Sequence, residues 1–273
     1  MTPKQVVLGK RTLIMGILNV TPDSFSDGGR FASTQHAVKN AKKMVDDGAD
    51  IIDIGGESSR PGADPVSVDE ELERVIPVVR GVTDETEAII SVDTCKAAVA
   101  DQALQAGADM INDITALRFD PDIVHVVAEA NASIILMHMQ GNPRTMQQTP
   151  AYTNLIDEVS LFLQESIEFA ESNGVAPGRI FIDPGIGFGK TVQHNLEILR
   201  QLDQFKRLGK PMLIGTSRKS FIGKILDLPV ECRLEGTAAT VAWSIAGGVD
   251  IVRVHDVKPM KRVAKMTDAI YRY

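Results

Sequence analysis

Two basic residues that could bind an anion, Arg253 and His255, lie two positions apart in the stretch DIVRVHD. Residues two apart on a β-strand point to the same face, so both would face one side while the neighbouring valines face the other. A buried guanidinium needs an anionic partner, because an unpaired buried charge costs several kcal/mol. Two kinds of partner are open: Asp53 or Asp93 within the protein, or a phosphate group of a substrate.

Two carboxylates and one amide stand in three other apolar stretches: Asp93 in AIISVDT, Asn112 in DMINDI and Asp183 in IFIDPGIG. A carboxylate accepts pairs of N–H bonds in one plane, which suits the guanidine-like edge of a flat heterocycle. Hydrogen bonding inside the core is the alternative for any one of them. Three such groups together indicate a binding site for a ring rich in N–H donors.

The glycine-rich segment DPGIGFGKT invites comparison with a phosphate-binding loop. The Walker spacing fails because Pro184 stands where its first glycine belongs, and the G-x-G-x-x-G spacing is also absent. The glycines instead predict a tight, open turn that brings Phe188 and Lys190 near a site. A plain turn without a functional role is the alternative.

The segment GTSRKSFIGKIL places Ser217 and Ser220 just before an apolar run with helical character. Either serine could cap a helix whose free N–H groups attract an anion. Of Arg218 and Lys219, we expect one to reach the site and the other to be solvated. An ordinary cap with a surface lysine is the alternative interpretation.

The segment NVTPDSFSDGGRF, residues 19–31, is poor in helix and strand formers and carries one large apolar side chain, Phe25. A loop rich in Pro, Asp and Gly lacks a local partner to cover a phenylalanine. We therefore expect this loop to hold a ligand.

Eight short apolar runs alternate with longer amphipathic stretches and predict eight strands, at 12–20, 50–56, 88–94, 109–114, 133–139, 180–187, 211–217 and 250–256. Helices are predicted between them, including 34–48, 68–82, 96–107, 121–131, 154–174 and 192–209. Repeated βα units predict an α/β fold, a TIM barrel in one domain over 1–273, with long loops after the first two strands. The polar residues above follow or end strands, so they would meet on one rim.

A short sequence pattern, Gly-x-Asp followed by an apolar run, occurs three times, in GADIID, GADMIND and GVDIVRV. In each, the glycine would end a helix and the aspartate would lead into a buried strand. Each is interpreted as the same joint between a helix and a strand. Trp243 lies in an apolar helical stretch and is expected in the core.

Composition narrows the classes of function and partner. The net charge of -7 and the lack of a basic block argue against nucleic acid as a partner. No apolar run approaches the roughly 20 residues that cross a membrane, and no signal peptide is evident, so we expect no membrane partner and a cytoplasmic location. Cys95 and Cys232 are expected as reduced thiols, and a zinc site is not expected.

With these residues in view, the chain resembles the dihydropteroate synthase family over essentially its whole length. The matching motifs, in the family's order, are NVTPDSFSDGG, GGESSRPGA, FIDPGIGFGK, GTSRKSFIG and VRVHDV. The resemblance implies a pterin-binding barrel and a transferase of folate biosynthesis. Such enzymes condense 6-hydroxymethyl-7,8-dihydropterin diphosphate with 4-aminobenzoate, giving 7,8-dihydropteroate and diphosphate. It also implies a homodimer and a target of sulfonamides.

The resemblance assigns site residues by matching motifs. Pterin would be held by Asp93, Asn112, Asp183 and Lys219, and diphosphate by Asn19, Arg60, Arg253 and His255, with Asn19 also binding Mg²⁺. The 4-aminobenzoate pocket would be formed by Phe25, Ser59, Arg60, Pro61, Phe188, Lys219 and Ser220. Catalysis would rest on Asp93, Lys219, Arg253 and His255. Ser59 stands where threonine is also common, which keeps a hydroxyl.

In this family the pterin diphosphate is thought to ionise first, after which the neutral amine attacks without a strong base. Two other functions are alternatives: a pterin-binding methyltransferase, which has no use for a diphosphate site, and a silent pterin-binding paralogue. The basic residues on the phosphate side favour the synthase over both.

Overall fold

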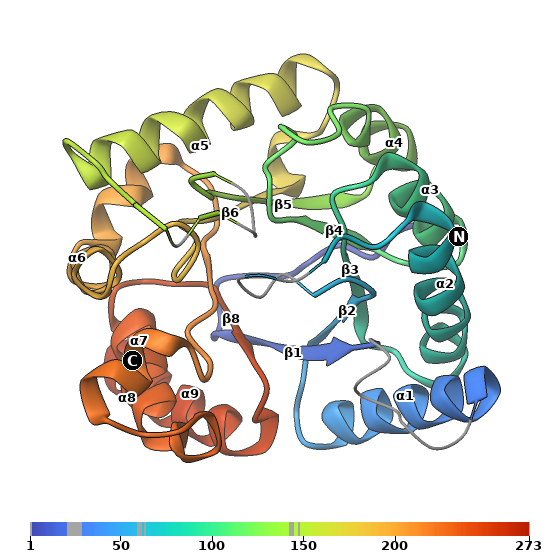
Figure 1. The fold of residues 1–273 in the computed structure, drawn as a ribbon. Helices are drawn as coiled ribbons and strands as arrows, with labels where there is room; N and C mark the ends of the chain where they lie inside the picture. The colour runs from blue at the N-terminus through green and yellow to red at the C-terminus, as the bar shows by residue number, and fades with distance from the viewer. Residues whose placement is uncertain are drawn as a thin grey trace.

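Eight parallel strands form a ring at the centre of the molecule, with helices around it (Figure 1). The computed structural model describes residues 2–20, 29–58, 62, 64–141, 145–146 and 148–272. The strands are β1 (Leu13–Asn19), β2 (Ile51–Gly55), β3 (Ile89–Asp93), β4 (Met110–Asp113), β5 (Ser133–Met137), β6 (Ile180–Asp183), β7 (Leu213–Ile214) and β8 (Ile251–Val254). Their order is β6-β5-β4-β3-β2-β1-β8-β7, and a parallel bridge from Ile182 to Met212 links the two ends. The predicted TIM barrel is confirmed.

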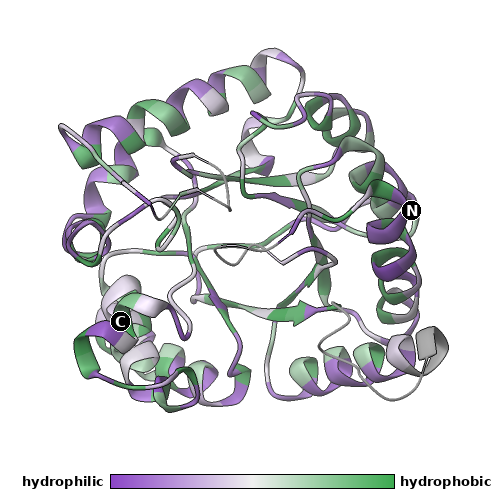
Figure 2. Ribbon diagram, in the orientation of Figure 1, coloured by the Kyte–Doolittle hydropathy of each residue, from purple (hydrophilic) through white to green (hydrophobic). Residues whose placement is uncertain are grey.

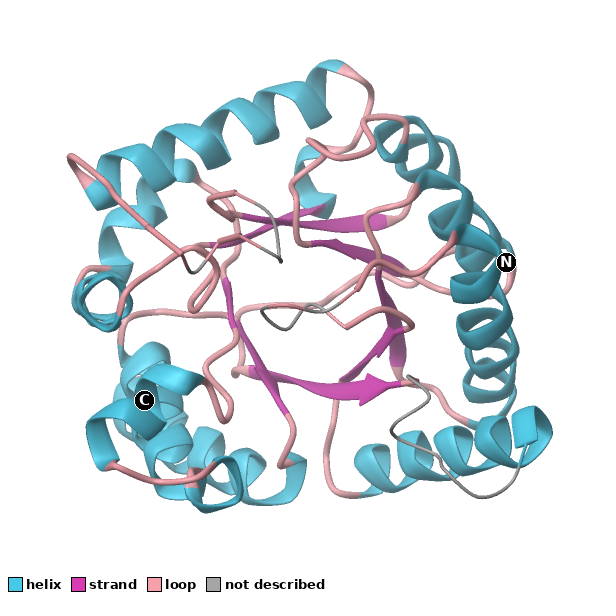
Figure 3. Ribbon diagram, in the orientation of Figure 1, coloured by secondary structure: helices cyan, strands magenta, loops and turns pink. Residues whose placement is uncertain are grey.

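The helices cover the outside of the ring (Figure 3). They are α1 (Gly29–Asp46), α2 (Val68–Glu85), α3 (Ala97–Gln105), α4 (Ile123–Ala130), α5 (Leu155–Ser172), α6 (Val192–Arg200), α7 (Ser220–Leu226), α8 (Leu234–Ala246) and α9 (Val257–Tyr271). Short 3-10 helices are η2 (Pro177–Arg179), η3 (Leu202–Leu208) and η4 (Val230–Cys232). Within the described residues, no helix has the length and apolar character needed to cross a membrane.

Successive side chains along each strand point alternately outward and inward, and this gives two separate apolar layers. One set of side chains faces the helices, as Val252 and Val254 do, and packs with the apolar faces of those helices. The helices are amphipathic, and hydrophobic and hydrophilic residues alternate along α5 in Figure 2. The other set points into the barrel, where Met15, Met110 and Phe181 belong to a separate apolar cluster. The polar residues of the site lie further along the same inward-facing rows.

The recurring Gly-x-Asp joint has a common structure at the N-terminal ends of three strands. Asp50 accepts a hydrogen bond from the backbone N–H of Ile14, at 2.9 Å. Asp109 accepts one from Ile90, and Asp250 accepts one from Met212, at 3.0 and 2.9 Å. Each carboxylate thus binds the strand that precedes its own, or the residue leading into it. Positive φ values at the three joint glycines make the turn that places the aspartate there.

Two expectations about elements were wrong. The single helix expected at 192–209 ends at Arg200 and continues as η3. Leu202 and Phe205, three residues apart, share a face in a 3-10 helix and are both buried there. Trp243 is not in the core: it is 57% exposed on α8, and its indole N–H donates to the carbonyl of Leu199.

Candidate active site

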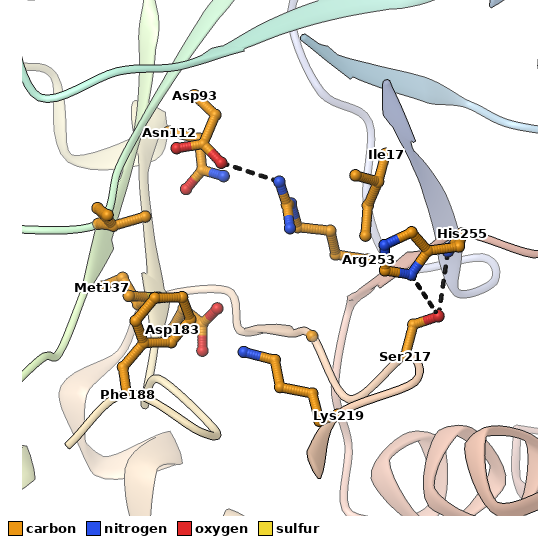
Figure 4. A pocket seen from close by; sticks show the side chains of 12 residues that line it. Ile17, Asp93, Asn112, Met137, Asp183, Phe188, Ser217, Lys219, Arg253 and His255 are labelled. Carbon is orange, nitrogen blue, oxygen red and sulfur yellow. Dashed lines mark hydrogen bonds and ion pairs between the residues drawn. The ribbon is translucent and has the colours of Figure 1, made fainter. Parts of the chain in front are cut away.

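A pocket opens at the C-terminal ends of the strands, and we call it the mouth pocket. Residues from β1, β3, β4, β5, β6 and β8 and from the segments that follow β4, β6, β7 and β8 line it (Figure 4). They are Ile17, Asp93, Asn112, Ile114, Met137, Asp183, Phe188, Gly215, Ser217, Lys219, Arg253 and His255. The strands therefore bring acidic, amide and basic groups together from distant parts of the sequence.

Arg253 occupies the basic side of the mouth pocket and is paired within the protein. Its Nε donates to Oδ2 of Asp53 at 2.6 Å, and Nη2 donates to Oδ2 of Asp93 at 2.9 Å. Burial lowers the pKa of Arg253, but these carboxylates outweigh it and the net direction is upward, which keeps the cation. Among the described residues, Nη1 has no hydrogen-bond partner. The internal ion pairs thus coexist with a donor group left for a further anion.

Asp53 is an organising residue of the site that the sequence suggested only as a possible ion-pair partner. It is fully buried, and its Oδ2 also accepts from Nδ2 of Asn112 at 3.1 Å. Because the amide nitrogen of Asn112 faces Asp53, its carbonyl oxygen is the branch turned away, as an acceptor. One carboxylate thus sets the orientation of both an amide and a guanidinium.

The two carboxylates of the mouth pocket lie in a poorly solvated setting. Burial raises the pKa of Asp93 to about 7, against the opposing charge of Arg253, and nearby Asp53 adds to the rise. Burial also raises the pKa of Asp183, which the N–H of Gly185 opposes by donating to Oδ1 at 2.7 Å. These groups can accept N–H donors of a ligand that replaces the missing water.

Lys219 extends into the mouth pocket with its amine pointing toward Asp183 (Figure 4). The amine donates to the carbonyl of Ile186 at 2.5 Å and lies 4.1 Å from the centre of the Phe188 ring. Burial lowers the pKa of Lys219 to about 7, with Asp183 opposing and Arg253 adding to the fall. Lys219 therefore bridges the acidic side of the pocket and its aromatic wall.

Ser217 orients His255 instead of capping a helix. Its Oγ contacts Nδ1 of His255 at 3.0 Å and accepts from the backbone N–H at 3.1 Å. The N-cap of α7 is Lys219, without a side-chain bond to the helix, and Ser220 is the first helical residue. The expected serine cap is therefore wrong.

Arg218 and Lys219 point apart, but Arg218 is not simply solvated. Its guanidinium makes two bonds to Asp256, at 2.9 and 2.6 Å, and its backbone has a φ of 56°. That left-handed backbone turns the two side chains in different directions, with Lys219 toward the mouth pocket.

The remaining predicted site residues lie at the rim or outside the described residues. Asn19 is exposed at the end of β1, in register with Gly55 and, across it, Asp93. Ser220 is exposed at the start of α7. Phe25, Ser59, Arg60 and Pro61 lie outside the described residues.

Two other residues near the site, His138 and Lys190, form a buried pair, with Nζ 2.8 Å from Nδ1. The sequence pattern leaves Lys190 open between a plain turn and a site residue and does not indicate its pairing with His138. The signal that could have identified them is a lysine inside a glycine-rich turn that otherwise holds apolar residues.

Comparison with known proteins identifies the family. The chain matches the pterin binding enzyme family over residues 15–255. It is 56% identical to the dihydropteroate synthase of Synechocystis over 97% of this chain and 92% of that protein. It is 52% identical to the Bacillus subtilis dihydropteroate synthase, over 98% and 92% of the two chains.

Solved structures agree with the sequence matches. A Clostridium difficile dihydropteroate synthase, determined in the presence of pteroic acid, has a TM-score of 0.93 and 50% identity, covering 98% of this chain and 100% of that one. A Yersinia pestis enzyme in a sulfonamide complex has a TM-score of 0.93 and 41% identity, covering 100% and 99%. A Xanthomonas albilineans enzyme with 4-aminobenzoic acid has a TM-score of 0.89 and 42% identity, covering 95% and 93%. The chain therefore belongs to the dihydropteroate synthase family of pterin-binding enzymes, transferases of folate synthesis.

Proposed function

We propose that this chain carries out the family's reaction in the mouth pocket, joining a dihydropterin diphosphate to 4-aminobenzoate with release of diphosphate. The observation that carries the proposal is the division of one pocket into an acidic side, with Asp93 and Asp183, and a basic side, with Arg253 and His255. A flat ring rich in N–H donors that bears a diphosphate has the matching distribution of donors and charge. Pteroic acid and 4-aminobenzoic acid accompany relatives in solved structures.

The pterin is proposed to lie on the acidic side. Asp183 and the carbonyl oxygen of Asn112 accept its amino and ring N–H donors, and Asp93 accepts further along the ring edge. Lys219 reaches over the same edge. Burial of these groups favours a ligand that supplies N–H donors, because unsatisfied buried acceptors are costly.

The diphosphate is proposed to lie on the basic side, against Arg253 and His255, with Arg60 contributing from outside the described residues. The carbon–oxygen bond to diphosphate breaks first, and the leaving group takes the electron pair. Arg253 and His255 stabilise the negative charge that develops there. The electron-rich ring stabilises the exocyclic cation until the amine of 4-aminobenzoate attacks it and loses a proton.

Magnesium is the cofactor that the family resemblance implies, and Asn19 would hold it. The side-chain oxygen of Asn19 lies at the rim near Asp93, with only Gly55 between them. Among the described residues, no three His, Cys, Asp or Glu side chains gather to hold an ion. One amide oxygen still fits Mg²⁺, which keeps several waters and binds through few protein oxygens plus substrate phosphates. When bound, the ion supplies positive charge beside the departing diphosphate.

The 4-aminobenzoate is proposed to pack against Phe188 and Lys219, with its carboxylate toward the start of α7 at Ser220. Phe25, Ser59, Arg60 and Pro61 are proposed to complete this pocket. Sulfonamides, which imitate this substrate, are proposed to bind at the same place.

A homodimer in the cytoplasm completes the proposal. Exposed apolar side chains gather on α7, on α8 and on the segment between them: Ile225, Leu226, Leu228, Val230, Leu234 and Trp243. Burial of such a surface against a second copy would stabilise a dimer. Light scattering after size-exclusion chromatography tests this, and a monomer at all concentrations would contradict it.

Mixing both substrates with Mg²⁺ and measuring diphosphate and dihydropteroate tests the proposed reaction. We expect both products in equal amounts, and we expect Asp183→Asn to lower kcat/KM for the pterin diphosphate by about 100-fold. Methyl transfer from a methylated pterin, without diphosphate release, would support the methyltransferase instead. Pterin binding without either reaction would indicate the silent paralogue.

A further inference from the structure

The turn at 184–190, which follows β6 and carries Phe188, is held by side chains at nearly every residue. Oδ1 of Asn195 accepts from the N–H of Gly187 at 2.7 Å. The hydroxyl of Tyr152 donates to the carbonyl of Gly189 at 2.8 Å. Lys190 donates to the carbonyl of Phe188 itself at 3.0 Å. A glycine-rich turn with this many tethers has a fixed shape.

Lys190 stands apart from the other tethers because its amine is buried. The residue is 2% exposed, and Nζ contacts Nδ1 of His138 in addition to the carbonyl of Phe188. Burial, and then the charge of Lys190, lowers the pKa of His138 to about 2. His138 is therefore neutral at working pH, so its Nδ1 can accept from the amine. The amine also reaches the carbonyl of His138 at 3.5 Å, so it bonds acceptors on both loops.

The loops after β5 and β6 touch backbone to backbone where Lys190 lies. A Cβ added at Gly185 would meet the carbonyl oxygen of His138 at 1.9 Å, and one at Gly189 would meet that of Gln140 at 2.6 Å. The two turns therefore fit together only through glycines. Lys190 and Tyr152 both join the two loops by hydrogen bonds, and Lys190 does so at the buried contact with His138.

The consequence reaches the mouth pocket through Phe188. Its carbonyl is fixed by Lys190, and its ring lies 4.1 Å from Nζ of Lys219, whose amine also bonds the carbonyl of Ile186. The ring position is thus set from two sides, by Lys190 behind the turn and Lys219 in front. Loss of the rear donor would leave the Phe188 carbonyl without its buried partner and free the turn to shift.

We propose that Lys190 is a positioning residue that holds Phe188 against Lys219 and so sets the affinity for 4-aminobenzoate, while leaving pterin binding largely unchanged. This rests on the proposed function, in which Phe188 and Lys219 form the wall of the 4-aminobenzoate pocket. The pterin acceptors Asp93 and Asn112 come from β3 and β4, on strands that Lys190 does not bond. The third acceptor, Asp183, ends β6 and feels the charge of Lys190, but its carboxylate is bonded by the N–H of Gly185 and not by Lys190. The effect should therefore fall on one substrate.

The experiment compares Lys190→Met, which keeps the length of the side chain but removes the amine, with wild type in steady-state kinetics. We expect KM for 4-aminobenzoate to rise at least about tenfold, while KM for the pterin diphosphate and kcat stay within about threefold. Lys265→Met, at an exposed position on α9, is the matched control and should behave as wild type. Equal losses for both substrates, or no change for either, would overturn the proposal.

Two further variants keep the test decisive. If Lys190→Met does not fold, Tyr152→Phe removes only the donor to Gly189 of the same turn, and we expect a smaller rise, about threefold, in KM for 4-aminobenzoate alone. No selective rise in that variant would then count against the proposal. Phe188→Ala distinguishes a wrong 4-aminobenzoate pocket from a wrong role for Lys190. If this variant leaves KM for 4-aminobenzoate unchanged, the assigned pocket is wrong. If Phe188→Ala raises that KM and Lys190→Met does not, only the role of Lys190 fails.

Discussion

At the residue scale, the site depends on carboxylates that serve different partners. Asp53 does not line the mouth pocket, yet it bonds both Arg253 and Asn112, which do. Asp93 lines the pocket and shares the same guanidinium. A guanidinium between the buried carboxylate of Asp53 and the partly buried carboxylate of Asp93 stays charged and correctly oriented before substrate arrives, which lowers the cost of reorganisation during the reaction.

Asp53→Asn should change how the enzyme depends on pH. Removing the negative charge beside Asp93 makes the ionised form of Asp93 less costly, so its pKa should fall below about 7. The acidic inflection of kcat/KM for the pterin diphosphate should move to lower pH. The plateau should drop about tenfold or more, because asparagine leaves Arg253 and Asn112 only a neutral oxygen in place of the charged acceptor that they share. Asp84→Asn, at an exposed position on α2, is the control, and an unmoved inflection would contradict this role.

The buried amine of Lys219 should destabilise the folded, ligand-free enzyme. Its folded pKa of about 7 is below the ordinary value of 10.5, so between these values the unfolded chain binds a proton that the folded one does not. The destabilisation is therefore absent above pH 10.5, grows as the pH falls, and is nearly complete at about pH 7. Lys219→Met should therefore unfold at higher denaturant than wild type at pH 7, with the gain shrinking toward pH 10.5, and should lose activity. A variant less stable than wild type at pH 7 would refute this account.

Residue types predicted the acidic and basic groups of the mouth pocket. A carboxylate or guanidinium inside an apolar strand must pair either with another group of the protein or with a ligand. The bonds between those groups could not be predicted. Asn112 and Asp53 are 59 positions apart, and Lys190 and His138 are 52 apart. No local pattern states which of several buried acceptors an amine or amide will reach.

At the element scale, strand and helix periodicity predicted the order of the elements, and the structure changed mainly their ends. β7 shrinks to two residues within the apolar run 211–217, and η3 replaces the second half of an expected helix. These ends are set by contacts with other elements, such as the burial of Phe205 and the bridge to Met212. Sequence patterning carries the period of an element but little about where tertiary packing ends it.

The contact between the turns after β5 and β6 gives a prediction at this scale. Gly185 and Gly174 both have positive φ, 73° and 95°, so alanine at either position is strained by about 1–2 kcal/mol. Only at Gly185 would the new Cβ meet a backbone oxygen, that of His138 at 1.9 Å; at Gly174 the nearest atom is the Ala128 Cβ at 3.7 Å. Gly185→Ala should lower the free energy of unfolding, measured in urea, by at least about 2 kcal/mol more than Gly174→Ala. Equal losses would show that the two turns separate easily.

At the scale of the whole molecule, the two ends of the barrel have different tasks. The C-terminal ends of the strands carry the mouth pocket, where burial moves the pKa values of Asp93 and Lys219 far from their ordinary values. The N-terminal ends carry the three Gly-x-Asp joints, whose carboxylates accept backbone N–H groups. The repeated Gly-x-Asp pattern thus has a structural role at the N-terminal ends of the strands. The residues of the mouth pocket do not repeat, because each has a different role in binding and catalysis.

This division predicts that stability and activity can be changed separately. Asp109 is 4% exposed and accepts from the N–H of Lys4 at 2.7 Å and from that of Ile90 at 3.0 Å. Asp109→Ala leaves both donors without an acceptor, so the free energy of unfolding should fall by about 1–3 kcal/mol. Asp250→Ala, at a separate joint, should cause a further fall of similar size, adding nearly independently in the double variant.

Both variants should keep kcat/KM for each substrate within about twofold at temperatures where they remain folded. The physical reason is that the apolar cluster of Met15, Met110 and Phe181 fills the barrel between the joints and the mouth. Close packing there leaves side chains in the mouth pocket little room to follow a local loosening at the opposite end. A fall in kcat/KM in fully folded Asp109→Ala would show instead that the register of β3 and β4, set at the joint, is transmitted to Asp93 and Asn112, and the two ends would then act as one unit.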